Sequence, residues 1–123
     1  MLEEKLQKWS NEFMQAWKDA DTDKILSLLS NNVRYYEDIF EEPLIGKKEV
    51  KPLWDVVKIN QKVHSYKNEV IYSDNKGGII HWTLTRASLP SGEEQEFNGV
   101  FEVHLNENNE CEFFRMWRHL RAS

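Results

Sequence analysis

The sequence has almost none of the residues that crosslink a chain or bind a structural metal. Cys111 is the only cysteine among 123 residues, so an internal disulfide is excluded and a reducing compartment is favoured. No Cys/His cluster has the spacing of a zinc site, and no metal ligation is expected. No repeat, low-complexity tract or linker divides the chain. We therefore expect one domain spanning residues 1–123.

The sequence also lacks an excess of positive charge and long apolar runs. The net charge is −5, which disfavours binding to nucleic acid or to an anionic membrane surface. The N-terminal Met-Leu-Glu-Glu-Lys lacks the character of a signal peptide, and no apolar run is long enough to span a bilayer. Neither a phosphate-binding glycine loop nor a dinucleotide fingerprint is present. The sequence thus predicts a cytoplasmic protein with no cofactor.

Aromatic residues are abundant, with 5 Trp, 4 Tyr and 6 Phe. Aromatic side chains fill volume with few rotatable bonds, and they pack cores or line pockets. Most of these rings are expected to lie in the core.

Three helices are expected in the first half of the chain. Apolar residues recur at steps of three and four over residues 2–19, which predicts an amphipathic helix. Asp21 and Asp23 supply N-cap chemistry for a second, short helix that ends at residues 30–32. A third helix follows Gly46. If it begins at Lys47, Pro52 should tighten or bend its first turn, whereas a start at Lys51 puts Pro52 at a favoured position.

Strands are predicted at residues 33–38, 63–73 and 78–89, with a turn at 74–78. In the third of these, Ile80, Trp82 and Leu84 share one parity. The last quarter of the chain predicts a long hairpin, with arms at 97–105 and 110–119. The second arm has large apolar groups on both parities, which indicates cover on both faces. The pattern predicts an α+β fold in which a curved, mostly antiparallel sheet wraps around N-terminal helices.

Several segments together resemble a known superfamily. They are Tyr36-Glu-Asp38, Pro43-Leu-Ile-Gly46, Asn98-Gly-Val-Phe-Glu-Val103 and Phe114-Arg-Met-Trp-Arg-His119. The chain resembles the nuclear transport factor 2-like (NTF2-like) superfamily, in particular its SnoaL-like members. This resemblance implies a cystatin-like cone with a deep apolar cavity, which usually dimerises through the outer sheet face. The superfamily contains isomerases, cyclases, dehydratases, epoxide hydrolases and non-catalytic proteins, so the fold alone does not settle the function.

The resemblance also implies candidate catalytic residues. Asp38 matches the position of the general base in isomerase relatives, although the spacing to Gly46 allows Glu37 to take that role. Phe13 and Phe101 stand where those isomerases carry oxyanion donors, which disfavours a steroid isomerase. His119 falls near a carboxylate position of cyclase-like members and can act as an acid or base near neutral pH.

The pairing of the hairpin decides which side chains face the cavity. A four-residue loop at 106–109, which the resemblance favours, pairs Leu105 with Glu110. A five-residue loop pairs Leu105 with Cys111 and turns the opposite face inward. With the favoured pairing, Arg118 reaches the cavity mouth, where it can hold an acidic ligand or a carboxylate. The expected ligand-binding residues are Trp17, Tyr36, Trp54, Trp82, Phe101, Phe114, Met116 and Arg118.

Two functions remain open at this point. One is a protein that binds a small hydrophobic or aromatic molecule and performs lyase, isomerase or hydrolase chemistry by proton transfer from Asp38, with His119 assisting. The other is a non-catalytic carrier or interaction module whose cavity is largely filled. In both cases the expected partner is a second copy, packed on the outer sheet face around Trp117.

Overall fold

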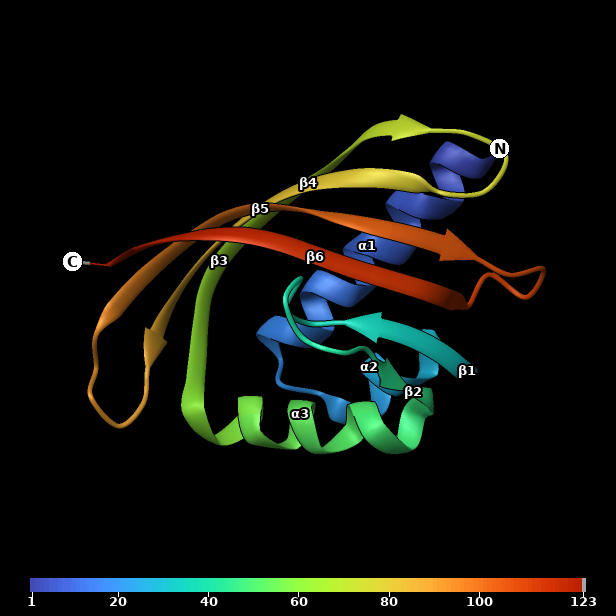
Figure 1. Ribbon diagram of the computed structural model, residues 1–123. Coiled ribbons are helices and arrows are strands. Elements are labelled where there is room, and N and C mark those ends of the chain that lie inside the picture. The colour runs from blue at the N-terminus through green and yellow to red at the C-terminus, as the bar shows by residue number, and fades with distance from the viewer. Residues whose placement is uncertain (123) are drawn as a thin grey trace.

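Helices cover one face of a curved sheet in the computed structural model, which describes residues 1–122 (Figure 1). The helices are α1 (Leu2–Lys18), α2 (Thr22–Ser27) and α3 (Gly46–Asn60). The strands are β1 (Leu29–Tyr36), β2 (Leu44–Ile45), β3 (Gln61–Ser73), β4 (Gly78–Ser88), β5 (Glu94–Leu105) and β6 (Cys111–Ala122). This arrangement confirms the predicted α+β class and the curved sheet.

Helix α1 buries the apolar stripe that its sequence predicts, with Leu6 and Phe13 fully buried. Helix α2 begins as expected, because the Asp21 side chain accepts a hydrogen bond from the Lys24 N–H (3.0 Å). It ends at Ser27, and residues 30–32 belong to β1, so the prediction that they terminate the helix is wrong. Pairing with β6 explains the difference: Leu29 lies opposite Cys111, whose N–H donates to Leu28 O (2.9 Å).

Helix α3 begins at Gly46, which adopts a left-handed backbone conformation with φ of +81°. The Ile45 N–H donates to the Glu49 carboxylate (2.8 Å), which fixes this start. Pro52 consequently lies inside the helix, and the alternative start at Lys51 is wrong. Since proline has no N–H, one intrahelical hydrogen bond is missing there.

The strand order β2-β1-β6-β5-β4-β3 places the last strand of the sequence inside the sheet. Strand β6 runs antiparallel to β5 and parallel to β1, and the other described pairs are antiparallel. This insertion brings the end of β1 beside residues 113–115, in the first half of β6. Residues about 80 positions apart in the sequence therefore become neighbours.

The β5–β6 hairpin combines features of both predicted registers. Leu105 pairs with Cys111, so the favoured pairing with Glu110 is wrong. A bulge follows immediately, and from His104 paired with Phe113 onward the register is shifted by one residue. The favoured face is nonetheless correct, because the bulge returns Phe114 and Met116 to the helix side, where both are buried.

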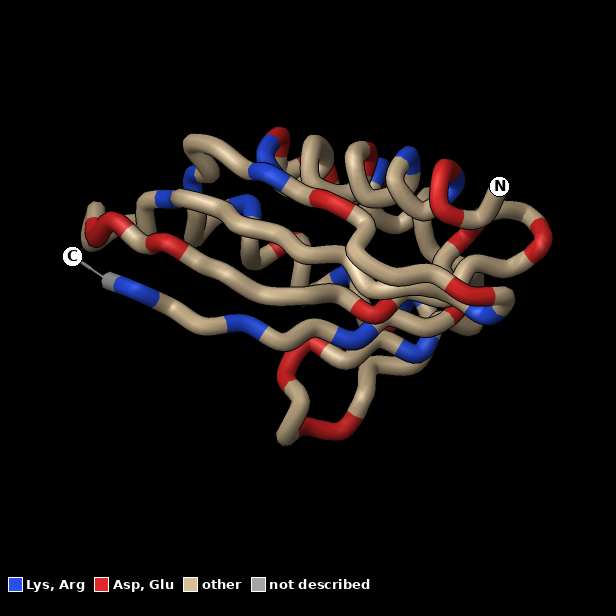
Figure 2. Tube along the Cα trace, turned by 90° about the horizontal axis from the view of Figure 1, so that it is seen from above, with Lys and Arg blue, Asp and Glu red and all other residues tan. Residues whose placement is uncertain are grey.

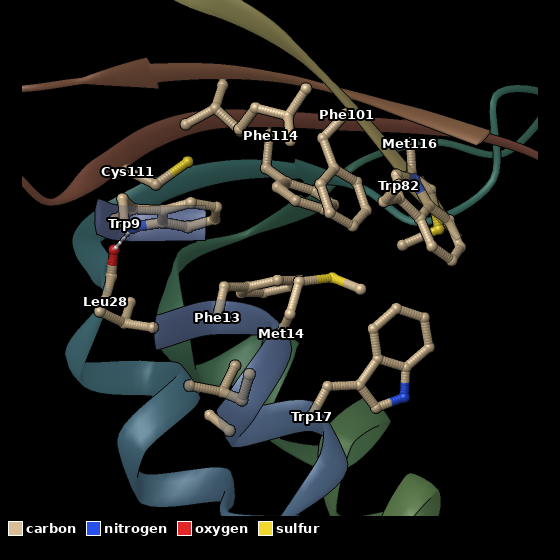
Figure 3. Close-up of a cluster of buried hydrophobic side chains, with 14 of the residues drawn as sticks. Trp9, Phe13, Met14, Trp17, Leu28, Trp82, Phe101, Cys111, Phe114 and Met116 are labelled. Atoms are coloured by element: carbon tan, nitrogen blue, oxygen red, sulfur yellow. Dashed lines mark hydrogen bonds between the residues drawn. The ribbon is translucent and has the colours of Figure 1, made fainter. Parts of the chain in front are cut away.

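Aromatic side chains fill most of the space between sheet and helices (Figure 3). Phe13 of α1 lies at the centre, with its ring centroid 5.5 Å from Phe101 and 5.3 Å from Phe114. Trp82 stacks on Phe101 at 4.9 Å. The Trp9 indole N–H donates to Leu28 O (2.8 Å) and ties this core to the end of α2. The base of the cone is therefore packed, and open space remains only toward its mouth.

Candidate functional site

The open space at the mouth of the cone has two connected parts. An inner pocket of about 70 Å³ lies between α1, α3 and the sheet. An outer groove of about 500 Å³ continues from it to the surface. Five residues line both parts, and we call this set the waist: Glu37, Arg86, Phe97, Met116 and Arg118.

The two parts differ in their remaining walls. The inner pocket is completed mainly by apolar groups: Trp17, Leu53, Trp54, Val57 and Gln61. The outer groove is completed by Asp38, Ile39, Phe40, Trp117, His119 and Leu120. Phe40 is 94% exposed at the groove's edge. The charged groups of the waist therefore lie where the inner pocket meets the outer groove.

Glu37 points to the waist because it continues the inward parity of β1. Val33 and Tyr35 precede it at steps of two, and both are fully buried. The Arg118 Nη1–H donates to Glu37 O (2.9 Å), and the same nitrogen lies 3.7 Å from Glu37 Oε1. The Glu37 side chain keeps 32% of its surface exposed. Its Oε2 atom, however, is buried and has no hydrogen-bond partner among the described residues.

This environment gives the Glu37 carboxyl an unusual acidity. Burial raises the pKa of Glu37 to about 7, since desolvation disfavours the charged carboxylate. The Arg118 and Arg86 cations and the Tyr35 hydroxyl oppose this rise, whereas the Asp38 charge adds to it. Both protonation states of Glu37 are consequently populated near neutral pH.

Two further buried polar groups lie near Glu37. The Tyr35 hydroxyl lies beside the Glu37 carboxyl, and the Trp54 indole N–H lies beside that hydroxyl. Within residues 1–122 neither reaches hydrogen-bond geometry with any partner. Burial raises the pKa of Tyr35, so its hydroxyl keeps its proton. Unpaired buried donors are uncommon in folded proteins, and here two of them adjoin each other, next to Glu37.

Arg86 supplies a second cation to the waist from β4. Its Nε–H donates to Gln95 Oε1 (2.8 Å), and its guanidinium carbon lies 4.4 Å from the Phe97 ring centroid. Burial and the neighbouring Arg118 charge both lower the pKa of Arg86. Figure 2 shows basic positions spaced along β6, beside the acidic residues of the loop that projects after β1. The waist therefore holds two guanidinium groups against one carboxyl of nearly neutral pKa.

The predicted catalytic pair occupies the outer groove. Asp38 is exposed, and its side chain accepts a hydrogen bond from the Phe40 N–H (2.9 Å). His119 is also exposed and lines the wall formed by β6. Neither residue reaches the inner pocket. Glu37, the alternative to Asp38, lines both parts.

The predicted ligand-binding residues fall into three groups. Those that line the inner pocket are Trp17, Trp54, Met116 and Arg118. Those that lie in the packed core, away from both parts, are Trp82, Phe101 and Phe114. Tyr36 has the opposite parity and lies with Phe113 on the outer sheet face, at 5.7 Å between ring centroids.

Arg86 and Phe97 are functional candidates that the sequence reasoning missed. A signal for Arg86 is present, because it continues the parity of Ile80, Trp82 and Leu84. A charged residue on the buried parity of a strand indicates a site at the strand's end. Phe97 begins the first arm of the predicted hairpin, where the sequence alone does not show that its side chain reaches the cavity.

Two of the histidines on the strands pair with carboxylates. His64 lies 3.0 Å from Glu94, and His104 lies 2.9 Å from Glu102. No group of three or more potential ligands is placed to hold a metal ion in the described part of the chain. Over the same residues, no helix is both long and apolar enough to cross a membrane.

A sequence profile of the SnoaL-like domain matches residues 11–111. The chain belongs to the SnoaL-like family. No curated protein matches it in sequence at a significant level.

Solved structures with the fold of this SnoaL-like chain are numerous but distant in sequence. A provisionally named isomerase from Bacillus subtilis has a TM-score of 0.85 at 12% identity, covering 94% of this chain and 87% of the other. SalBIII, an epoxide hydrolase/cyclase-like enzyme of salinomycin pyran ring formation, has a TM-score of 0.81 at 12% identity and 98% coverage of both chains. The Δ5-3-ketosteroid isomerase from Mycobacterium sp. has a TM-score of 0.74 at 14% identity, covering 95% and 98%. At these identities, the comparisons establish the fold.

Proposed function

We propose that this SnoaL-like protein binds a small, partly apolar organic molecule across the waist and transfers a proton to or from it through Glu37. The observation that carries the proposal is the Glu37 carboxyl, with Oε2 buried and unpaired and a pKa of about 7. A general acid or base is most effective when its pKa lies near the working pH. Perturbed carboxyl groups in a cleft are also typical of functional sites.

The surroundings of Glu37 suit chemistry in which negative charge develops on the ligand. Arg118 and Arg86 supply fixed positive charge, and Trp54, whose indole N–H is unpaired among the described residues, lines the inner pocket as a neutral donor. Donors that are already in place stabilise a developing oxyanion without reorganisation. Isomerase relatives carry oxyanion donors at the positions of Phe13 and Phe101, which cannot donate hydrogen bonds. The donors near Glu37 offer an alternative to them. Relatives of the same fold are named as isomerases and as an epoxide hydrolase/cyclase-like enzyme, which also supports small-molecule chemistry.

The proposal predicts a measurable titration of Glu37. In a ¹³C-detected NMR pH series, the Glu37 carboxyl should titrate near pH 7, because its Oε2 is buried. Asp38, its exposed neighbour, serves as the internal comparison. Addition of apolar compounds should then shift the resonances of Trp54 and Met116, which line the pocket. An ordinary glutamate pKa for Glu37, together with no response to any compound, would refute the proposed function.

A non-catalytic carrier remains the second candidate, and the filled core favours it. Phe13, Phe101 and Trp82 occupy the base of the cone, so only about 70 Å³ is left inside. A carrier should release every bound compound unchanged. Mass spectrometry of compounds recovered after incubation separates the two functions, with Glu37→Gln as the inactive control.

We also propose that two copies pair through the outer sheet face. Phe113 and Trp117 lie on that face, and Arg115 stacks over both rings, at 5.3 and 4.9 Å from their centroids. An aromatic patch of this kind on a sheet favours self-association. Trp117→Glu should therefore convert a dimer to a monomer in sedimentation velocity, whereas Ile59→Glu on α3 should not. A dimer that survives Trp117→Glu would contradict this interface.

A further inference from the structure

We infer that the molecule bound at the waist is an organic acid, whose carboxylate lies between Arg86 and Arg118 while its apolar body lies in the outer groove. This inference rests on the proposed function, since it specifies the ligand of the same site. It follows from the arrangement of charge around the two openings.

The waist has more positive than negative charge. Arg118 is close enough to Arg86 for its charge to lower the pKa of Arg86. Glu37 is the carboxyl near both arginines, and it is partly protonated near pH 7. In a protein whose overall charge is −5, this local excess of positive charge is notable. An anion placed between the two guanidinium groups would relieve their repulsion.

Both arginines have donors left for a ligand. Arg86 uses its Nε–H on Gln95, and Arg118 uses Nη1 on the Glu37 carbonyl and the Met116 sulfur, so the other terminal N–H groups of both have no hydrogen bond to the described residues. Phe97 and Gln95 hold the Arg86 guanidinium in place before any ligand arrives. Guanidinium groups bind carboxylates through paired, charge-assisted hydrogen bonds.

The outer groove has the size and the apolar surface to bind the rest of the ligand. Ile39, Phe40 and Leu120 are exposed apolar residues, at 38%, 94% and 52%, and all three line this groove. At about 500 Å³ it has room for an aromatic or alkyl body, whereas the inner pocket of about 70 Å³ admits only a small group. A ligand that combines one carboxylate with an apolar body matches both features.

Binding of an acid should also be coupled to the proton on Glu37. The groups that face this carboxyl are Arg118 from β6, Arg86 from β4, Tyr35 from β1 and the adjacent Asp38. A bound carboxylate disfavours a second negative charge beside it, so Glu37 takes up a proton on binding. Affinity should therefore fall as the pH rises through about 7.

The test uses matched acids and amides: 2-naphthylacetate, 3-phenylpropionate and octanoate, each with its primary amide. Affinity is measured by NMR titration and calorimetry from pH 6 to pH 8. Each pair differs little in shape, so the difference in affinity reports on the charge. At pH 6 we expect at least one acid to bind about tenfold or more tightly than its amide, the ratio typical of charge-assisted hydrogen bonds.

Four variants test whether the preference for acids over amides comes from the waist. Arg86→Gln and Arg118→Gln should each abolish the preference for acids and leave amide binding in place. Arg121→Gln is the matched control, because Arg121 lies on β6 and pairs with Glu96, outside the waist. Glu37→Gln should make acid affinity nearly independent of pH, and at pH 8 its affinity should exceed that of the parent protein.

The outcomes distinguish this inference from the proposed function. If amides bind as tightly as acids, or if Arg121→Gln weakens acid binding as much as Arg118→Gln, the acid assignment is wrong and the pocket still binds a ligand. If no member of either series binds at millimolar concentration, the acid assignment is also wrong. In that case the Glu37 titration decides separately whether the proposed function survives.

Discussion

Glu37→Gln should stabilise the fold at pH 8, by roughly 2 kcal/mol in the free energy of unfolding. Burial raises the pKa of Glu37 from 4.5 to about 7, and a rise of this size corresponds to about 3 kcal/mol in full. We reduce this figure because 32% of the side chain remains exposed and solvent screens its charge. Glutamine keeps a similar shape without the buried charge.

The sign of the pH dependence follows from proton linkage. Between pH 4.5 and 7, unfolded Glu37 releases its proton while folded Glu37 retains it. The unfolded state then binds fewer protons, so the stability contributed by this group is complete below pH 4.5 and decreases until about pH 7. The parent protein and Glu37→Gln should therefore have similar stabilities at pH 4 and differ at pH 8. Urea unfolding at several pH values measures this difference.

Glu41→Gln provides the control for the change in net charge, since Glu41 is an exposed acid of the same loop. It should change stability by less than about 0.5 kcal/mol, as surface substitutions usually do. If Glu37→Gln proves equally neutral at pH 8, the carboxyl is not desolvated in solution. If Glu37→Gln instead stabilises the protein at pH 8, the Glu37 charge lowers the stability of the parent protein. That is the pattern expected of a residue retained for function.

Phe13→Ala should destabilise the protein by about 3–5 kcal/mol, the range for removing a large buried aromatic side chain. Phe13 is fully buried and contacts the rings of Trp9, Trp54 and Phe101, among others. Its removal leaves a void that the stacked neighbours on α1 and the sheet cannot easily fill. Thermal and urea unfolding measure the loss.

Phe40→Ala is the matched control, because it removes the same side chain at a position that is 94% exposed. It should leave stability within about 0.5 kcal/mol of the parent protein. Phe13→Leu, which keeps most of the volume, should recover much of the stability. An equally small effect of Phe13→Ala would show that the base of the cone is open in solution, contrary to the packing in Figure 3.

Periodicity in the sequence was sufficient to predict the helices and the class of fold. The apolar stripe of α1 and the alternation in β4 each specify one buried face, and the structure buries those faces. Periodicity also contained information about the site that was not used. Glu37 and Arg86 both continue a buried parity, after Tyr35 and Leu84 respectively, whereas Asp38 does not.

Other features depend on contacts that no local pattern encodes. The bulge after Cys111 reverses the parity of β6 in one step, so alternation alone could not give its register. Residues 30–32 have the composition of a helix end, but the pairs Leu29–Cys111 and Arg34–Phe113 on either side of them place them in β1. The size of the chamber depends on how Phe13, Trp82 and Phe101 interlock in three dimensions. Family resemblance suggested a deep cavity, and the aromatic packing leaves a shallow one.

The position of β6 in the sheet has a consequence for the order in which the molecule can assemble. Strands β1 and β5 both need β6 as a neighbour, and β6 is translated after either of them. Until it emerges from the ribosome, a nascent chain has two long strands with unpaired backbone groups, which are prone to association with other chains. Glu37 and Arg118 likewise meet only when β6 docks. Vectorial synthesis therefore completes the proposed ligand site in the same event that closes the sheet.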